Sequence, residues 1–346
     1  MRSNTATYLM ATGEALVVKE APYTPAGDDD IVVKNHAVAL NPVDRAIQTR
    51  GQKLFPWLQF PLILGGDVAG EVVEVGSAVT RFQVGDRVVG YAAGLGTPES
   101  SRCGCQAYTL LHSNNAARIP SAMSYEQASV LPLTLATATY GLFKKDFLAL
   151  EYPSTRPKST GKTLLVWGGA TSVGCSAIQL AVAAGYEVIA TASPKNFAMV
   201  KRLGASAVFD YKEPSITEDL TRIFRGKTCA GAMCVAGVDP QSRQDAADAC
   251  FEVVGKSEGS KFVALAGQVT KPIPEGVTGK FIMGGDQDSN ELMRLIYEDF
   301  LPTALEEGTF VPAPEPRVVG HGLESMQTGL EILQNGVSAQ KIVVSL

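Results

Sequence analysis

The chain has 346 residues and a mass of 36.5 kDa, a length typical of about two domains. Hydrophobic residues make up 45% and charged residues 19%, so the chain can bury a core and is not disordered. The 30 Lys and Arg and the 35 Asp and Glu residues give a net charge of −5 with no basic block. We therefore expect no nucleic-acid-binding surface and no anionic-membrane surface.

The N-terminal residues and the cysteines indicate the compartment. No long apolar stretch follows Arg2, so an ordinary secretory signal is not expected. The apolar runs elsewhere fall short of the roughly 20 residues of a membrane span. Free thiols in a reducing, cytoplasmic compartment are therefore expected for the six cysteines. They are Cys103, Cys105, Cys175, Cys229, Cys234 and Cys250.

Residues 1–120 predict a barrel-like, all-β region with few helices. Runs rich in β-branched residues at 31–34, 70–75 and 86–89 are bounded by Gly, Asp or Pro. The pattern changes near residue 124, where Ser124 is a predicted helix N-cap and Gln127 would complete a capping box. Helical spacing follows over 128–148.

The middle of the chain predicts a doubly wound, parallel α/β sheet. After a polar, Pro-rich loop at 151–162, predicted strands alternate with helices, which is typical of βαβ units. From Gly308 a Pro-rich loop leads to one helix and a final strand. The predicted strands are 163–167, 187–191, 207–209, 232–235, 261–265 and 341–344, and the predicted helices are 173–184, 197–203 and 323–334.

A glycine-rich turn follows the first strand of this sheet. Gly169–Gly174 matches the dinucleotide pattern G-x-G-x-x-G, except that Thr171 replaces the middle glycine. Small residues there let backbone amides and the positive end of a helix approach a pyrophosphate. The alternative is a tight strand–helix turn without a ligand.

The end of the second strand favours NADP(H) over NAD(H). NAD-binding sheets usually carry an acidic residue there, which binds the ribose 2′-hydroxyl. This chain instead has Ser193-Pro194-Lys195-Asn196, whose hydroxyl, ammonium and amide groups suit a 2′-phosphate. The alternative is a Ser-Pro turn with a solvated lysine.

Six segments together resemble the medium-chain dehydrogenase/reductase superfamily, in its quinone-oxidoreductase and enoyl-reductase branch. They occur in the expected order over nearly the whole chain: 41–44 (NPVD), 65–72 (GGDVAGEV), 84–88 (VGDRV), Leu131-Pro132 followed by Thr137, 168–174 and 338–344 (SAQKIVV). The segments 167–172 and 193–197 are similar to a fungal subgroup that includes the trans-acting enoyl reductase of lovastatin biosynthesis and toxin-cluster relatives.

The resemblance implies an architecture and a cofactor. It implies a GroES-like β-rich catalytic domain over 1–125, a Rossmann NADP(H)-binding domain over 126–307 and a return to the catalytic domain over 308–346. NADPH is the implied cofactor, and the substrate is a small-molecule or carrier-bound unsaturated compound. A polyketide synthase is an implied candidate partner, and both monomers and homodimers occur among relatives.

The resemblance also implies the site residues. Thr137 would act beside the reacting carbonyl, and the turn at 193–196 would bind the 2′-phosphate with Tyr211 at the adenosine end. The residues implied to contact the cofactor are Val43, Asp44, Arg45, Ala170, Thr171, Ser172, Val173, Ser193, Pro194, Lys195, Asn196, Tyr211, Leu265, Ala266, Ser338 and Ala339. The residues implied to contact substrate are Thr137, Tyr140, Ile282, Met283 and Gly284.

No metal site is expected. Zinc alcohol dehydrogenases of this superfamily carry a Cys in the segment that is 41–44 here and a His in the segment that is 65–67, and neither ligand is present. Only Cys103 and Cys105 stand where four Cys would form a structural zinc lobe. His36, His112 and His321 have no partners in sequence. The expected chemistry is therefore metal-free hydride transfer from NADPH to an activated C=C of an enoyl thioester, enone or quinone.

Several positions depart from the family and keep other readings open. Ala46 replaces a frequent Lys, Ala266 stands where a polar residue can occur, and residues 46–64 contain no Tyr to donate a proton. These departures also suit a cofactor-binding structural or regulatory protein with little or no turnover. A zinc alcohol dehydrogenase is a third possibility. The aromatic residues Phe55, Trp57 and Phe60 either roof an apolar pocket or belong to the core.

Overall fold

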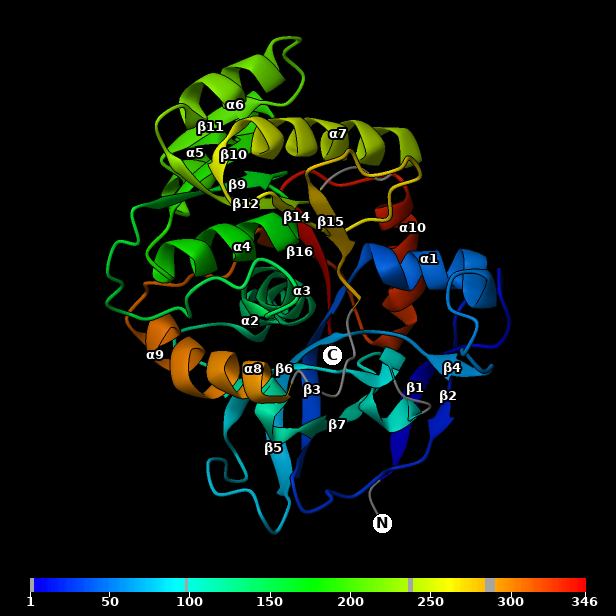
Figure 1. Cartoon of the computed structure of the whole chain (residues 1–346). Helices are drawn as coiled ribbons and strands as arrows, with labels where there is room; N and C mark the ends of the chain where they lie inside the picture. The colour runs from blue at the N-terminus through cyan, green and yellow to red at the C-terminus, as the bar shows by residue number, and fades with distance from the viewer. Residues whose placement is uncertain (1–2, 97–98, 236–238, 284–289) are drawn as a thin grey trace. The chain divides into compact units, whose positions relative to one another are not determined.

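The computed structural model describes residues 3–96, 99–235, 239–283 and 290–346 (Figure 1). The chain divides into two units, and each is described by itself. The β-rich unit comprises Met1–Leu133 and Gly285–Leu346, and the Rossmann unit comprises Thr134–Gly284. None of the described helices is long and apolar enough to cross a bilayer.

Two sheets build the β-rich unit. A three-stranded sheet has the order β2-β1-β4, and the larger sheet has the order β16-β17-β3-β5-β6-β8, with β7 paired to β3. The predicted strands at 31–34 and 70–75 are confirmed as parts of β3 and β5, and the one at 86–89 overlaps β6, which begins at Arg87. The bounds are β1 (Asn4–Leu9), β2 (Val17–Ala21), β3 (Asp30–Leu40), β4 (Leu62–Ile63), β5 (Asp67–Val75), β6 (Arg87–Tyr91), β7 (Tyr108–His112), β8 (Ala116–Arg118), β16 (Glu315–His321) and β17 (Gln340–Ser345).

Helices contribute more to this unit than the sequence predicts. α1 (Pro42–Arg50) begins at a capping box, in which Asn41 is the N-cap and Asp44 lies three residues on. α10 (Met326–Gln334) packs against α1 and β17. A helical stretch of α8 (Asn290–Arg294), the π-helical η7 (Leu295–Phe300) and α9 (Leu301–Glu306) packs near β8. Short 3₁₀ turns complete the connections: η1 (Gly51–Lys53), η2 (Gly94–Gly96), η3 (Ser100–Arg102), η4 (Ser113–Asn115) and η8 (Leu323–Ser325).

The predicted helix over 128–148 is wrong as one element. The N-cap prediction is confirmed, because the Ser124 side chain accepts the Gln127 N–H and the Gln127 side-chain oxygen accepts the Ser124 N–H. The helix that this cap begins, α2 (Tyr125–Ser129), is short, and a second helix, α3 (Pro132–Phe143), starts three residues later. Pro132 has no N–H and disfavours a helical conformation at the residue before it, so it starts a new helix.

The sheet of the Rossmann unit has the order β11-β10-β9-β12-β14-β15, with β13 beside β12. All of these pairs are parallel. In chain order this is 3-2-1-4-5-6, the order of doubly wound dinucleotide-binding sheets, so the predicted fold class is confirmed. The bounds are β9 (Lys162–Trp167), β10 (Glu187–Ala192), β11 (Ala207–Asp210), β12 (Thr228–Cys234), β13 (Glu258–Gly259), β14 (Phe262–Leu265) and β15 (Thr278–Phe281).

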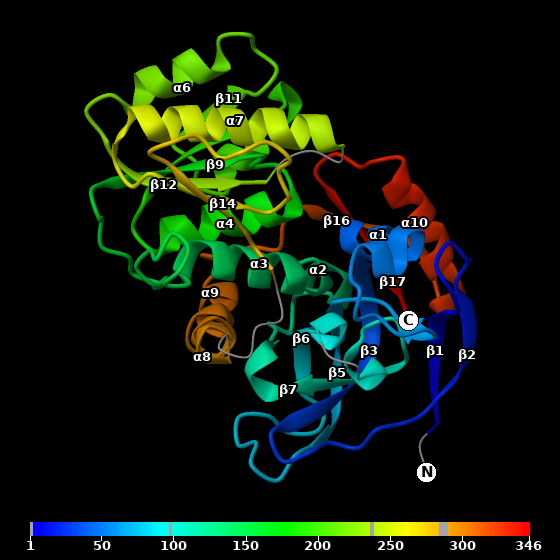
Figure 2. The ribbon, with the colours of Figure 1, turned by 45° about the vertical axis from the view of Figure 1, so that its right-hand side comes forward.

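Helices cover both faces of this sheet. α4 (Ser172–Ala183) and α7 (Pro240–Lys256) lie on opposite faces, as Figures 1 and 2 both show. α7 packs on β12 and β14 and, with α6 (Ile216–Phe224), closes an apolar core. α5 (Phe197–Arg202) follows the 3₁₀ turn η5 (Pro194–Asn196). All six cysteines of the chain are buried free thiols.

The domain bounds expected from the sequence differ from the contact-based units. The first bound was expected between 125 and 126 and lies after Leu133, because α2 packs on β3 and β5 of the β-rich unit. The second was expected between 307 and 308 and lies at 284/285. The stretch 290–306 belongs to the β-rich unit, where the buried Tyr297 donates its hydroxyl to the Pro132 carbonyl (3.1 Å).

Candidate functional site: a glycine-rich turn and a polar network

The turn between β9 and α4 requires glycine at two positions, Gly168 and Gly174. Gly168 has φ +83°, and a Cβ there would lie 1.8 Å from the Val235 carbonyl oxygen. A Cβ on Gly174 would lie 2.2 Å from the Gly168 carbonyl oxygen. Neither position can hold a side chain without moving backbone, so the glycines keep this turn tight.

Thr171, at the place of the missing middle glycine, caps α4. Its Oγ1 donates to the Gly168 carbonyl (2.8 Å) and accepts the Gly174 N–H (3.0 Å). The buried Thr191 anchors the other side of the turn, because its Oγ1 accepts the Gly168 N–H (3.0 Å) and its carbonyl accepts the Gly169 N–H (2.8 Å). Sequence reasoning missed Thr191, a β-branched residue inside a predicted strand.

The outer side of the turn suits an anion. Ala170, Ser172 and Val173 are half-buried and Thr171 is exposed. The N–H groups of Ser172 and Val173 belong to the first turn of α4, where a helix has no carbonyl of its own to offer them. With the positive end of a twelve-residue helix behind them, these amides fit a pyrophosphate group.

The turn after β10 brings two predicted residues together. Ser193 Oγ lies 3.2 Å from the Tyr211 hydroxyl, and either can be the donor. The parallel pairing of Ala192 with Asp210 places their next residues side by side. Lys195, on η5, is exposed, and within the described part of the chain it makes no hydrogen bond or ion pair. Pro194 is also exposed, and Asn196 is half-buried with its N–H on the Ser193 carbonyl (2.8 Å).

A carboxylate near this turn was not foreseen, because it comes from the third strand. Asp210 ends β11, and its Oδ1 accepts the Lys212 N–H (3.0 Å). This bond turns at least one carboxylate oxygen toward its own chain. The cationic Lys195 and the two hydroxyls remain the groups that suit an added negative charge.

The predicted residues at the end of β14 have mixed outcomes. The Leu265 side chain is buried in the core, and its carbonyl accepts the Ile282 N–H (2.8 Å), so this residue offers no side chain to a cofactor. Ala266 is half-buried, with its N–H on the Cys234 carbonyl (2.9 Å). Met283 is 52% exposed. Gly284 lies outside the described residues.

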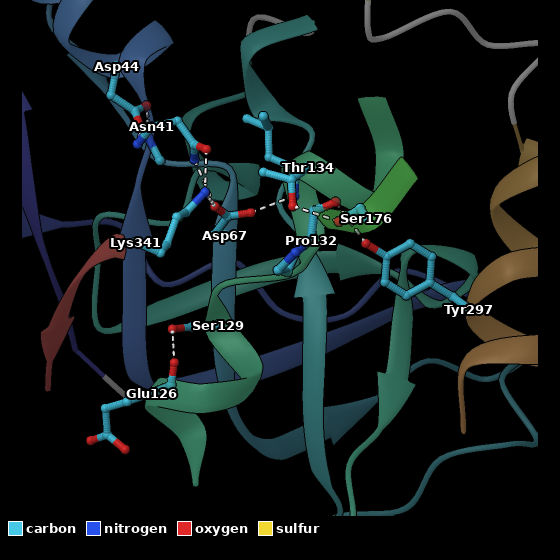
Figure 3. A network of polar contacts seen from close by, with 12 residues as sticks. Asn41, Asp44, Asp67, Glu126, Ser129, Pro132, Thr134, Ser176, Tyr297 and Lys341 are labelled. Atoms are coloured by element: carbon cyan, nitrogen blue, oxygen red, sulfur yellow. Dashed lines mark hydrogen bonds and ion pairs between the residues drawn. The ribbon is translucent and has the colours of Figure 1, made fainter. Parts of the chain in front are cut away.

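Three predicted substrate residues meet at α3. Thr137 and Tyr140 stand three apart and share a helix face with Gly141. A Cβ on Gly141 would lie 2.7 Å from Ile282 Cδ1, so the buried Ile282 packs directly against this helix. The structure therefore gathers Thr137, Tyr140 and Ile282 on one side of α3. Thr134, in the first turn of α3, is tied to α4 through its Oγ1, 3.2 Å from Ser176 Oγ (Figure 3).

Asp44 is bonded within the β-rich unit. It was expected to line the nicotinamide, but its side chain is fully buried and its two oxygens accept the Asn41 N–H (2.7 Å) and the Gly65 N–H (3.0 Å). Burial raises the pKa of this carboxyl to about 6, although the two N–H donors act in the opposite direction. Asp44 therefore holds the start of α1 through backbone hydrogen bonds, and its contact with the cofactor stays a prediction.

The other predicted residues of this unit remain accessible in part. Val43 is half-buried, and Arg45 donates to Gln48 and to Gln334 at the end of α10. Ser338 is exposed, and Ala339 is half-buried with φ +51°, a left-handed conformation rare for a residue other than glycine.

The three aromatic residues after α1 do not share one environment. Phe55 and Phe60 are partly buried against the core of the β-rich unit. Trp57 is 53% exposed, so a core position is wrong for this residue. Its Nε1–H donates to the Leu95 carbonyl (3.2 Å), and its ring lies 5.1 Å from that of Phe55.

A polar network lies in the interior of the β-rich unit (Figure 3). The Lys341 Nζ lies 2.8 Å from Asp67 Oδ2 and also donates to Asn41 Oδ1. Asn41 Nδ2 donates to the same Asp67 oxygen (2.7 Å), and Asp67 Oδ1 accepts the Leu133 N–H. Asn41, Asp67 and Lys341 are 2%, 0% and 3% exposed.

The donor set at these positions does not fit zinc. The segments where zinc enzymes of the superfamily carry Cys and His here supply an amide and two carboxylates, and the Lys341 ammonium already pairs with one of them. Zinc sites are built from thiolates, neutral imidazoles and carboxylates in a compact set. Burial raises the pKa of Cys103 to about 12 and that of Cys105 well above its usual value, which disfavours thiolates. No cluster of three metal-ligating side chains occurs within the described ranges.

Two family models match the chain in the order of its units. The alcohol dehydrogenase GroES-like domain matches residues 27–132, and the zinc-binding dehydrogenase domain matches residues 172–269. The second match begins at Ser172, within the glycine-rich turn, and covers β10–β14. The second family is named for zinc binding, but the amide, carboxylate and ammonium groups described above still do not suit zinc.

Curated relatives and solved structures extend the match to the whole chain. Dehydrogenase azaJ of Aspergillus niger is 54% identical over 346 residues, covering all of both proteins. LovC of Aspergillus terreus, named the enoyl reductase component of lovastatin nonaketide synthase, is 32% identical and covers 96% of this chain and 93% of its own. An alcohol dehydrogenase superfamily protein from Novosphingobium aromaticivorans shares the fold, with a TM-score of 0.76 at 24% identity over 99% of both chains. The chain therefore belongs to the medium-chain dehydrogenase/reductase family, close to the fungal dehydrogenases and trans-enoyl reductases of secondary metabolism.

Proposed function

We propose that this oxidoreductase uses NADPH to reduce an activated C=C, without zinc. The proposed substrate is an enoyl thioester, an enone or a quinone, and the relatives favour a carrier-bound enoyl thioester of a polyketide synthase. The turn after β10 carries the cofactor part of the proposal. There Ser193 and Tyr211 present two hydroxyl groups 3.2 Å apart, and the exposed Lys195 follows two residues after Ser193.

The chemistry of that turn supports a phosphorylated ribose. A 2′-phosphate carries close to two negative charges near pH 7 and accepts several hydrogen bonds. Lys195 supplies a full positive charge, and the hydroxyls of Ser193 and Tyr211 supply donors. A 2′-hydroxyl would instead need an acceptor such as a carboxylate. The carboxylate of Asp210, which pairs with Ala192 at the end of β10, already accepts the Lys212 N–H through its Oδ1.

Different residues of the chain would bind the cofactor, stabilise charge on the substrate and orient the alkene. When bound, NADPH supplies a hydride to the β-carbon of the activated alkene. The amides of residues 170–173 would hold the pyrophosphate, and residues 193–196 with Tyr211 the 2′-phosphate. Thr137 would donate its hydroxyl to the substrate carbonyl oxygen, which gains negative charge as the hydride arrives. Tyr140 and Ile282, on the same side of α3, would exclude water and orient the alkene.

A binding experiment tests the cofactor. NADPH and NADH are titrated into the protein, and the dissociation constants are measured by nicotinamide fluorescence or calorimetry. We expect tighter binding of NADPH. Lys195→Ala should raise the NADPH dissociation constant by about 10- to 100-fold and leave that of NADH unchanged, because a charge-assisted contact is removed. Lys201→Ala, at an exposed lysine on α5, is the matched control and should change neither constant. A preference for NADH would contradict the assignment.

An activity assay tests the substrate class. Loss of NADPH absorbance is followed with enoyl thioesters, enones, quinones and an enoyl group carried on an acyl carrier protein. We expect turnover with at least one activated alkene and faster turnover with the carrier-bound one. No oxidation of NADPH with any acceptor would reject the proposal.

A second candidate is a cofactor-binding protein with little or no turnover. Ala46 and the absence of tyrosine from residues 46–64 favour it, because they leave the proton donor unassigned. This candidate predicts tight NADPH binding with no reduction of any acceptor, including the carrier-bound one. The two experiments together separate it from the reductase.

A further inference from the structure

Asp67 joins three distant segments of the chain inside the β-rich unit. Its carboxylate accepts hydrogen bonds from the side-chain amide of Asn41 and the ammonium of Lys341 (Figure 3). It also accepts the backbone N–H of Leu133. Lys341 and Asn41 are also bonded to each other. We call Asn41, Asp67 and Lys341 the buried triad.

Each of these segments carries predicted site residues. Asn41 is the N-cap of α1, whose first turn contains Val43 and Arg45. Lys341 lies two residues after Ala339 and three residues after Ser338. Leu133 lies in the first turn of α3, one helical turn before Thr137. Five predicted site residues are thus each within four residues of a contact with Asp67: Val43, Arg45, Thr137, Ser338 and Ala339.

Two further hydrogen bonds hold the same segments. The Tyr297 hydroxyl donates to the Pro132 carbonyl (3.1 Å), next to the Leu133 N–H that Asp67 accepts. Arg45 donates to Gln334, so α1 is also held to the helix that precedes Ser338. Moving Asp67 would therefore release one bond from each segment at once.

Stability alone is a poor explanation for the buried triad. Burying an ion pair removes two charges from water, and well-packed apolar residues of similar volume often serve stability equally well. The apolar core around it already includes Val38, Leu64 and Val68. What an apolar cluster cannot do is aim hydrogen bonds at Asn41 and Leu133. The triad therefore fits a geometric role better than a stabilising one.

We infer that Asp67 and Lys341 are positioning residues for the proposed reduction, a role that rests on the proposed function. Neither side chain touches substrate or cofactor, because both are buried and fully bonded within the triad. They act through Asn41 and Leu133, and so set where Val43 and Ser338 stand in the β-rich unit and where α3 begins. Lys341 supplies the positive charge that pairs with the buried Asp67 carboxylate.

The test separates positioning from stability with a charge-balanced pair of substitutions. Lys341→Met alone leaves Asp67 buried without its partner, so it should lower Tm and kcat together. Asp67→Asn combined with Lys341→Met buries no charge, and the new amide oxygen can still accept the Leu133 N–H. We expect the double variant to recover most of the lost Tm but to keep kcat at least about tenfold below the wild type, as misplacement of reacting groups commonly costs.

Three further measurements complete the design. Lys341→Arg keeps the charge and should recover part of kcat. Binding of 2′,5′-ADP, which has the phosphates but no nicotinamide, should be unchanged in every variant, because it requires only the turns of the Rossmann unit. Glu252→Gln with Lys256→Met removes an exposed ion pair of α7 and should leave kcat at the wild-type value.

A double variant whose kcat stays within about twofold of the wild type would overturn the inference, since the geometry would not need the pair. So would a kcat that returns in proportion to Tm. Failure of the proposed function looks different, because the wild type itself would then oxidise no NADPH. In that case the inference falls with the function, while the 2′,5′-ADP titration still reports on the Rossmann unit.

Discussion

The hydroxyl groups of Ser193 and Tyr211 lie 3.2 Å apart although the residues are 18 positions apart in the chain. The pair exists because β10 and β11 are parallel neighbours in register, with Ala192 opposite Asp210. A short, polar corner of the sheet therefore contains two hydroxyls whose donors and acceptors can be rearranged around an anion.

Tyr211→Phe should weaken NADPH binding by about three- to tenfold, because one hydroxyl contact contributes about 1 kcal/mol. NADH binding should not change. The measurement is the dissociation constant of each cofactor. Tyr152→Phe, at another exposed tyrosine of the same unit, is the matched control and should bind both cofactors as the wild type does. An equal loss for NADPH and NADH in Tyr211→Phe would contradict a specific contact with the 2′-phosphate.

Gly174→Ala should abolish cofactor binding while the rest of the fold persists. The new Cβ would lie 2.2 Å from the Gly168 carbonyl oxygen, so the turn must open and its amides must move. We expect a loss of at least about 2 kcal/mol in unfolding free energy, typical of a backbone clash in a buried turn. Calorimetry with NADPH and thermal unfolding measure the two effects.

Gly255→Ala is the control, because this glycine also lies in a helix. Its Cβ would meet only Val277 Cγ1, at 3.4 Å, so the substitution should be neutral or raise stability by about 0.5–1 kcal/mol. If Gly174→Ala bound NADPH as tightly as Gly255→Ala does, the tight turn would not be the binding element.

The buried Asp44 carboxyl should make stability fall as pH rises from about 4 to 6. Its pKa is raised to about 6 in the folded chain, from an ordinary value of 3.8. In that range the folded protein keeps a proton that the unfolded chain has released, so folding is favoured at the acidic end and the cost is fully present above pH 6. The shift corresponds to at most about 3 kcal/mol.

Asp44→Asn isolates this contribution, because the amide does not titrate. The free energy of unfolding is measured by urea denaturation at several pH values for both proteins. The wild type should lose stability relative to the variant between pH 4 and pH 7. A difference that stays constant with pH would show that Asp44 titrates normally.

Removal of metal should have no effect. The positions where zinc would be bound present an amide, two carboxylates and an ammonium, which is an unsuitable set for the ion. Dialysis against a chelator should leave Tm and NADPH oxidation unchanged, and elemental analysis should find much less than one zinc ion per chain. Stoichiometric zinc whose loss stops turnover would contradict the metal-free mechanism.

Local patterns predicted most of the Rossmann unit. The strands at 163–167 and 187–191 and the helix at 173–184 agree with β9, β10 and α4 to within a residue or two at each end. Such elements carry their own hydrophobic periodicity and turn residues. α1 escaped prediction because its segment has few apolar residues, and its capping box depends on Asn41 and Asp44 rather than on a hydrophobic stripe.

The site could be predicted only in part, because much of it depends on contacts between distant segments. Ser193 and Lys195 were identified from one short turn. The anchoring role of Thr191 follows from hydrogen bonds across parallel strands, and the burial of Asp44 follows from the Gly65 N–H, 21 positions away. The hydrogen bond between Lys341 and Asn41 joins residues 300 positions apart, and no local pattern in the sequence predicts it.

The central place of β17 has a consequence for biosynthesis. This strand lies between β16 and β3, so the larger sheet of the β-rich unit is incomplete until residues 340–345 have left the ribosome. The Rossmann unit, by contrast, is contiguous in the chain and can close much earlier. During translation the nascent β-rich unit therefore lacks the Lys341 partner of Asp67 until the chain has grown well past the Rossmann unit.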